Sequence, residues 1–208
     1  MTAAAKTYHH GDLRNAMIVA AAELIEESGS LNFSMADAAR RAGVSAAAPY
    51  RHFRDKEALL DAVAQLGFLG LSESARAARD AEPGGSIEAI IAIGWNYLDY
   101  VTGKAAFYDL MWGDIGARAF DAEQFDRKAA GFFVLVETVE AFFQAESVEG
   151  IDVLDVSIKL WAMVHGFSAI SMSGKLPYFH PRADVRAMID STTRTFMKGL
   201  LEGRGSAA

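Results

Sequence analysis

The stretch Ser34–Phe53 constrains the fold more than any other part of the chain. Ser34 can cap a short helix, Met35–Ala42, because a serine hydroxyl accepts a free amide at a helix start. Gly43 can end that helix, because glycine adopts the left-handed conformation that often follows a helix. A second short helix, capped by Ser45, then reaches Phe53. Two short helices joined by a glycine-containing turn predict a helix-turn-helix, whose second helix enters the DNA major groove.

Residues inside this stretch suit a close crossing of two helices. Ala38 and Ala39 are small where the helices meet, and Val44 can fill the space between them. Pro49 lies past the first turn of the second helix, where a residue without an amide proton is awkward. We therefore expect a tightened or kinked start to that helix.

Most of the remaining chain also has helical periodicity, with apolar residues three and four positions apart. Glycine and proline punctuate it, most clearly between Ala81 and Gly85. No segment shows convincing strand alternation, so we predict an all-α fold of about nine helices. The other helices are expected over Asp12–Ser28, 56–79, 87–101, Phe107–Trp112, Asp121–Glu146, Asp152–Ser173 and Arg182–Glu202, with a loop over Gly113–Ala119.

Composition narrows the functional classes. The chain has no cysteine, which excludes disulfides, thiolate metal sites and cysteine nucleophiles. The formal net charge is −7, the wrong sign for a simple nucleic-acid binder. Residues 1–56, however, carry seven Lys and Arg against six Asp and Glu, so all of the excess acidity lies in the rest of the chain. A small DNA-reading module attached to an acidic body would have this distribution.

The helix-turn-helix resembles the TetR family signature. That signature is a Gly-Val-Ser turn followed by Tyr-x-His-Phe and a lysine at the next helix start, here Gly43-Val44-Ser45, Tyr50, His52, Phe53 and Lys56. Residues Tyr8–Arg14 and the run Trp161-Ala-Met-Val-His165-Gly166 resemble one TetR branch, which has a Trp-x-x-x-His-Gly motif in its C-terminal domain. The resemblance implies a DNA-binding domain over 8–56, a linking helix over 56–79, and a ligand-binding and dimerisation domain over 86–203.

The resemblance also implies roles for single residues in DNA binding. Ser45, Ala46, Ala47 and Ala48 would face the major groove, with alanine methyls available to thymine methyls. Tyr50, His52 and Lys56 would contact phosphate, with Arg51 and Arg54 as further candidates. Ser34 either only caps its helix or also contacts phosphate. Tyr8, His9, His10 and Arg14 would form a basic arm or a phosphate contact, with a disordered terminus as the alternative for His9 and His10.

A ligand cavity in the C-terminal domain is likewise implied by the family. Candidate lining residues are Trp95, Tyr100, Phe107, Trp112, Phe132, Trp161 and His165. The aromatic residues could instead be ordinary core, and His165 a structural histidine. His165 lies one helical turn after Trp161, and Asn96, Tyr97 and Asp99 offer other polar groups.

The last two helices are expected to form a homodimer interface. Small residues recur about once per turn at Ala162, Gly166, Ala169 or Ile170, and Ser173, and small residues let helices approach closely. Met188, Ser191, Thr192 and Thr195 make a weakly polar face on the final helix. Packing within one chain is the alternative explanation. A dimer would read the two half-sites of a palindromic operator in double-stranded DNA.

The favoured hypothesis is therefore a cytoplasmic repressor released from its operator by an unidentified small molecule. No metal-ligand spacing, phosphate loop or nucleophile elbow occurs, so we expect no metal, no cofactor and no enzyme activity. No uninterrupted apolar run is long enough to span a membrane, and the first residues lack the apolar core of a secretion signal. Two alternatives stay open: a constitutive DNA-binding regulator without a ligand, and a helical enzyme or small-molecule carrier that has lost DNA binding.

Overall fold

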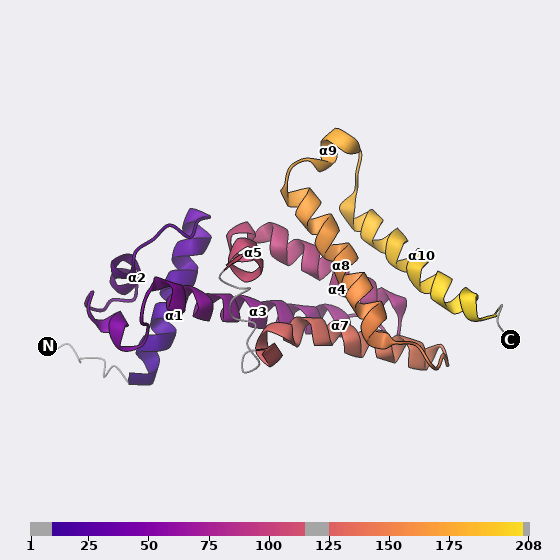
Figure 1. Ribbon diagram of the computed structural model, residues 1–208, viewed down its shortest axis with the longest axis horizontal. Helices are drawn as coiled ribbons and strands as arrows, with labels where there is room; N and C mark the ends of the chain where they lie inside the picture. Colours follow the sequence, from indigo (N-terminus) through magenta and orange to yellow (C-terminus); the bar gives the residue numbers. More distant parts are fainter. Residues whose placement is uncertain (1–9, 115–124, 206–208) are drawn as a thin grey trace, which may run out of the picture. The chain divides into compact units, whose positions relative to one another are not determined.

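The computed structural model describes residues 10–114 and 125–205, and within these residues it contains helices and no strand (Figure 1). The predicted all-α fold is confirmed. The helix start expected at Asp121 and most of the loop expected over Gly113–Ala119 lie outside the described residues. The elements in order are α1 (His10–Ser28), α2 (Met35–Arg41), the 3₁₀ helix η1 (Ala48–Arg51), α3 (Lys56–Asp80), α4 (Ile87–Gly103), α5 (Ala105–Trp112), α7 (Phe125–Ala145), α8 (Val153–Met172), α9 (Leu176–Phe179) and α10 (Val185–Gly205).

Side-chain caps begin several of these helices. The Asp55 carboxylate accepts the Ala58 amide at 2.9 Å, and the Ser86 hydroxyl accepts the Ala89 amide at 3.2 Å. Asp152 accepts the Asp155 amide at 3.0 Å at the start of α8. Each cap satisfies an amide that has no partner inside its own helix.

The second helix of the predicted helix-turn-helix differs from the expectation. The sequence predicts an α-helix from a Ser45 cap to Phe53, but the structure has a turn and then η1, whose N-cap is Ala47. Pro49 is the physical reason, because it has no amide proton to give an α-helical bond to Ser45. The Ser45 carbonyl instead accepts the Ala48 amide at 3.0 Å, and the Pro49 carbonyl accepts the His52 amide at 2.9 Å, both three residues apart. The expected tightening therefore extends from Ser45 to His52, while the Phe53 amide bonds to the Pro49 carbonyl four residues back, at 2.9 Å.

The chain packs as two compact units, and α3 contributes to both. The described residues of the first unit are 10–67, 104–114 and 125, and those of the second are 68–103 and 126–205. In the first unit, α1 packs against α2 and η1. Its core includes the fully buried side chains of Met17, Ile25 and Leu59, with Ala38 of α2 also buried.

Helix α5 packs with the first unit, although the sequence places it in the middle of the predicted 86–203 domain. A Cβ added at Gly67 of α3 would lie 2.8 Å from the Met111 sulfur and 3.4 Å from the Phe107 ring. Lys104, directly before α5, forms an ion pair with Glu26 of α1. The functional domain boundaries stay a prediction, while the packing assigns residues 104–114 to the first unit.

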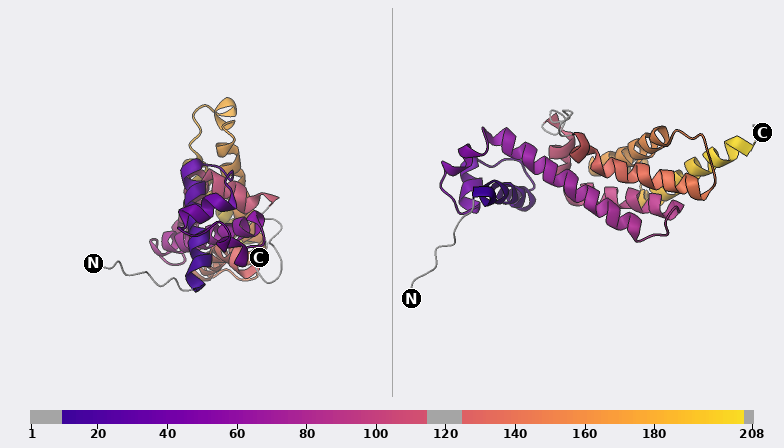
Figure 2. Two further views of the ribbon diagram at one scale, coloured as in Figure 1. Left: turned by 90° about the vertical axis from the view of Figure 1, so that its left-hand side faces the viewer. Right: turned by 90° about the horizontal axis from the view of Figure 1, so that it is seen from below.

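The second unit is a bundle in which α4, α8 and α10 contact one another. Its core joins α7 and α8 with the end of α3, and it includes Val134, Val139, Phe142, Phe143, Val156, Leu160 and Met197. Helices α8 and α10 form a hairpin with the short, unpredicted α9 at its tip (Figures 1 and 2). Two residues of α9, Tyr178 and Phe179, are among the most exposed large side chains described.

Helix α8 alone, among the described residues, has the length and composition of a membrane-spanning helix, with a mean hydropathy of 1.3. This is weak evidence for a membrane span, because core helices of soluble proteins have the same properties. Val156, Leu160 and Val164 of α8 are buried within the second unit.

Candidate functional site

The residues predicted to read DNA form an exposed surface on the turn and η1 of the first unit. Ser45, Ala46 and Ala47 are exposed, and Tyr50 has 60% of its surface accessible. Arg51 is exposed, whereas Ala48 and His52 are half-buried. Pro49 and Phe53 are buried between them and anchor the segment. The surface therefore offers small side chains, one phenol and one guanidinium on a fixed backbone.

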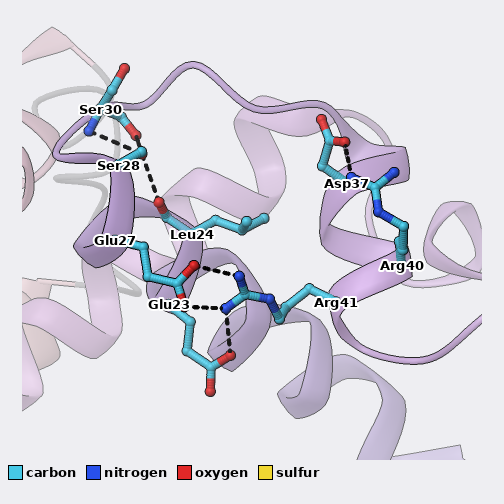
Figure 3. A network of polar contacts seen from close by, with 8 residues as sticks. All are labelled: Glu23, Leu24, Glu27, Ser28, Ser30, Asp37, Arg40 and Arg41. Atoms are coloured by element: carbon cyan, nitrogen blue, oxygen red, sulfur yellow. Dashed lines mark hydrogen bonds and ion pairs between the residues drawn. The ribbon is translucent and has the colours of Figure 1, made fainter.

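A capping box fixes the start of α2. The Ser34 hydroxyl accepts the Asp37 amide at 3.1 Å, and the Asp37 carboxylate accepts the Ser34 amide at 2.9 Å and the Ser34 hydroxyl proton at 2.6 Å. Arg40 donates to the other Asp37 oxygen at 2.6 Å (Figure 3). The bond from the Ser34 hydroxyl, followed by the Ser34 amide and Arg40, lowers the pKa of Asp37 to about 2. The structure thus confirms Ser34 as a cap, while its phosphate contact stays a prediction.

A second polar network in the first unit fastens α2 to α1. The Arg41 guanidinium donates to both carboxylate oxygens of Glu27 and, at 3.3 Å, to Glu23 (Figure 3). The hydrogen bond from Arg41 holds the pKa of Glu27 below its usual value. The paired geometry fixes the angle of α2 on α1 better than a single contact would.

Lys56 has a structural contact that the sequence did not predict. Its ammonium donates to the Leu31 carbonyl at 2.7 Å and lies 4.6 Å from the centre of the Phe33 ring. An ammonium has three donors, so this bond leaves room for a phosphate oxygen. Among the other predicted cations, Arg54 forms an ion pair with Asp55 at 2.7 Å, and Arg14 lies over the Phe53 ring at 5.5 Å. Tyr8 and His9 lie outside the described residues.

The second unit brings three of the seven predicted ligand residues together. The rings of Phe132 and Trp161 lie 6.3 Å apart, and those of Trp161 and His165 lie 5.2 Å apart. The Tyr97 hydroxyl and His165 Nδ1 are 2.6 Å apart, within hydrogen-bonding distance. Phe132, Trp161 and His165 are half-buried, and Tyr97 is buried. We call Tyr97, Phe132, Trp161 and His165 the aromatic cluster.

The other four predicted ligand residues lie elsewhere. Trp95 donates to the Arg186 carbonyl at 3.0 Å and has the Arg186 guanidinium 5.6 Å from its ring, which ties it to α10. The Tyr100 hydroxyl packs over Gly70, where an added Cβ would lie 2.8 Å from it. Phe107 and Trp112 belong to α5 in the first unit.

Sequence reasoning missed the importance of two serines. Ser72 of α3 and Ser168 of α8 are fully buried in the second unit, and their hydroxyl oxygens have no hydrogen-bond partner among the described residues. The spacing of Ser168 offered a signal, because it follows Trp161 by seven residues and His165 by three, and so lies on the same helical face. No signal in the sequence distinguishes Ser72 from other helical serines.

Because His165 is half-buried, we expect the free energy of unfolding to depend on pH. Desolvation lowers the pKa of His165 from its usual value of 6.5, so the unfolded chain binds a proton more readily than the folded one. The free energy of unfolding is therefore highest above pH 6.5, where His165 is neutral in both states. It decreases as the pH falls toward the folded-state pKa, because the unfolded chain takes up the proton first. Urea unfolding at pH 7.5 and 5.5 should show lower stability at the acidic pH. The difference should shrink in His165→Gln, and an unchanged difference would contradict the assignment.

Comparison with known proteins identifies both parts of the chain. The family model for bacterial regulatory proteins of the TetR family matches residues 17–63, and the model for the tetracyclin repressor-like C-terminal domain matches residues 90–196. No curated protein sequence matches.

Solved structures have the same fold over most of the chain. A protein of unknown function from Rhodococcus sp. RHA1 is 28% identical, with a TM-score of 0.77 over 94% of this chain and 98% of the other. The TetR family regulator PfmR from Thermus thermophilus is 20% identical, with a TM-score of 0.54 over 89% of this chain and 97% of the other. FadR from Bacillus subtilis, solved in complex with stearoyl-CoA, is 16% identical, with a TM-score of 0.61 over 86% and 95%. The first family model covers the helix-turn-helix, and the second covers most of the C-terminal helices. This protein therefore belongs to the TetR family of DNA-binding transcriptional regulators.

Proposed function

We propose that this regulator is a homodimeric, cytoplasmic repressor that binds a palindromic operator and is released by a small molecule. The observation that carries the proposal is the exposed surface of Ser45–Ala47, Tyr50 and Arg51, held by the buried anchors Pro49 and Phe53. Because three of the groove-facing side chains are alanines, direct base reading is limited. Operator choice then depends strongly on half-site spacing and DNA shape.

The outer face of α8 supports the dimer. Leu154, Ile158 and Ile170 are among the exposed large hydrophobic residues, at 55%, 44% and 48% of their surface, and Ala162 between them is also exposed. Gly166 lies on the same stripe, and a Cβ added there would meet nothing within 4 Å. A stripe of apolar and small residues four apart suits close packing against the same stripe of a second copy. We call Leu154, Ile158, Ala162, Gly166 and Ile170 the α8 stripe.

The aromatic cluster supports an effector site. It combines half-buried rings with a phenol and an imidazole, the mixture that small-molecule sites commonly have. FadR, which shares the fold, was solved with stearoyl-CoA and gives an example of a small-molecule complex. An effector acts by favouring a dimer in which the two DNA-reading surfaces no longer match two half-sites, with a coupling free energy of about 1–3 kcal/mol. TetR regulators are generally not enzymes, and we assign this one no catalytic role.

Anisotropy titration of the full-length protein with DNA from upstream of its own gene tests the proposal. Labelled upstream duplex should bind more tightly than a scrambled duplex of the same length and composition. Equal affinities would contradict operator recognition. Specific binding that no compound reverses would favour the constitutive regulator.

Replacing Lys56 with alanine should weaken binding to all duplexes by a similar factor. The lost ammonium contacts one phosphate, so the plot of log affinity against log salt should flatten by about one unit. Lys56→Arg should keep most of the salt dependence, and Lys198→Ala, at an exposed position on α10, should leave it unchanged. A selective loss at one base position would contradict the phosphate assignment.

A further inference from the structure

The two buried serines that lack partners stand out against two other buried hydroxyls of the second unit. Thr138 donates to the Val134 carbonyl and Ser157 to the Val153 carbonyl, each at 2.7 Å, the usual arrangement for a hydroxyl inside a helix. Ser168 and Ser72 have no such bond among the described residues, although both are fully buried. A buried hydroxyl without a partner is destabilising, so its presence needs an explanation.

The positions of both serines relate them to the aromatic cluster. On α8, Trp161, His165 and Ser168 occur at positions i, i+4 and i+7, which places them on one face of the helix. On α3, the backbone of Ser72 lies beside Gly131, where an added Cβ would be 3.8 Å from the Ser72 Cα. Gly131 directly precedes Phe132, whose ring packs against Trp161. Ser168 therefore shares a helical face with two residues of the cluster, and the backbone of Ser72 lies beside the residue that precedes a third.

No fully buried side chain among the described residues of the second unit carries a charge that could neutralise an ionic ligand. The buried polar side chains among the described residues are Ser72, Thr138, Ser157, Ser168 and Thr193, with no buried Asp, Glu, Lys or Arg. Desolvation also favours the neutral form of His165 by lowering its pKa. A carboxylate or ammonium group bound here would lose its hydration without gaining a buried counterion from the described residues, which is unfavourable.

We propose that the aromatic cluster binds an uncharged aromatic molecule that carries a hydroxyl or carbonyl group, and that Ser168 forms a hydrogen bond with that group. The half-buried rings of Phe132 and Trp161 supply the apolar contact surface, and Ser72 is the second hydroxyl available to the ligand. The inference rests on the proposed effector site and adds its chemical class: neutral, aromatic and hydrogen-bonding.

Three probes of nearly equal shape test the chemical class: 2-naphthol, naphthalene and 2-naphthoate. Binding to the full-length protein is measured without DNA, by isothermal titration calorimetry at pH 7.5. We expect 2-naphthol to bind about tenfold more tightly than naphthalene, because only the naphthol satisfies a buried hydroxyl. We expect 2-naphthoate to bind most weakly. Absence of binding by both uncharged probes, or tightest binding by the naphthoate, would overturn the proposal.

Ser168→Ala is the informative variant, and Ser157→Ala is its matched control. Both replace a fully buried serine of α8, but only Ser157 has its hydroxyl satisfied within the helix. Ser168→Ala should remove the preference for naphthol over naphthalene, with a Tm in the absence of ligand equal to or above that of the wild type. Ser157→Ala should keep the preference. A preference that survives in Ser168→Ala would overturn the role of Ser168.

Failure of the inference is separable from failure of the proposed function. Release of operator DNA by 2-naphthol is measured in a separate anisotropy titration. Binding of 2-naphthol with the expected Ser168 dependence, but without DNA release, would leave the site in place and contradict only the ligand-responsive repressor.

Discussion

Replacing Ile158 with aspartate should convert the protein to a monomer and lower its operator affinity at least about 100-fold. Ile158 lies in the α8 stripe with 44% of its surface exposed, and in the proposed dimer it faces the same stripe of the second copy. A carboxylate in that apolar contact would be buried without a counterion, and two of them would meet near the symmetry axis. The monomer reads one half-site and loses the gain from binding two at once. Size-exclusion chromatography with light scattering gives the mass, and anisotropy gives the affinity.

Leu69→Asp is the matched control for this substitution. Leu69 is 50% exposed and also lies in the second unit, on α3 rather than in the α8 stripe. This variant should keep the mass and operator affinity of the wild type. A dimeric Ile158→Asp protein would place the interface elsewhere.

Phe53→Ala should destabilise the DNA-reading surface by about 3–5 kcal/mol, the usual effect of removing a buried phenylalanine. Only 3% of the Phe53 surface is exposed, its amide donates to the Pro49 carbonyl at 2.9 Å, and Arg14 lies over its ring. Because η1 is a single short turn, it has little stability of its own and depends on this anchor. Urea unfolding followed by circular dichroism measures the decrease in the free energy of unfolding, and amide hydrogen exchange measures the loss of protection in η1. Operator binding should fall with it.

Two further variants separate anchoring from DNA contact. Phe53→Leu keeps most of the buried volume and should cost under about 1.5 kcal/mol. Tyr50→Ala, at a side chain that is 60% exposed, should weaken operator binding with little change in stability. Wild-type stability in Phe53→Ala would show that η1 is held by other contacts.

Some of the helix starts were predictable because their signals are local. Ser34 caps α2 as the sequence predicts, and Asp55 and Ser86 accept amides at the starts of two helices expected to begin at residues 56 and 87. The error over Ser45–Phe53 arose because a periodic pattern and a serine cap favour an α-helix, whereas Pro49 removes the bond that would form one. The four-residue α9 was missed because so short a helix has almost no periodicity.

The candidate sites were predictable only in part. The family signature led to residues that lie on one exposed surface of the first unit, and the Trp-x-x-x-His-Gly motif led to two members of the aromatic cluster. Sequence spacing could not show that Trp95 is tied to Arg186 or that Lys56 is bonded to the Leu31 carbonyl, because those partners lie far away in the chain. It also could not show which buried serines lack a partner, since that depends on how whole helices pack.

The grouping of α5 with the first unit bears on how such regulators can be recombined. The polypeptide leaves the first unit within α3 and returns to it after Gly103, so the DNA-reading module is not one continuous stretch of sequence. A fragment that ends at Gly67 would lack the Met111 and Phe107 side chains, which cover this glycine. It would also lack Lys104, which forms an ion pair with Glu26. Exchange of DNA-binding specificity between relatives, by gene shuffling or in the laboratory, would therefore need residues 104–112 to accompany the N-terminal segment.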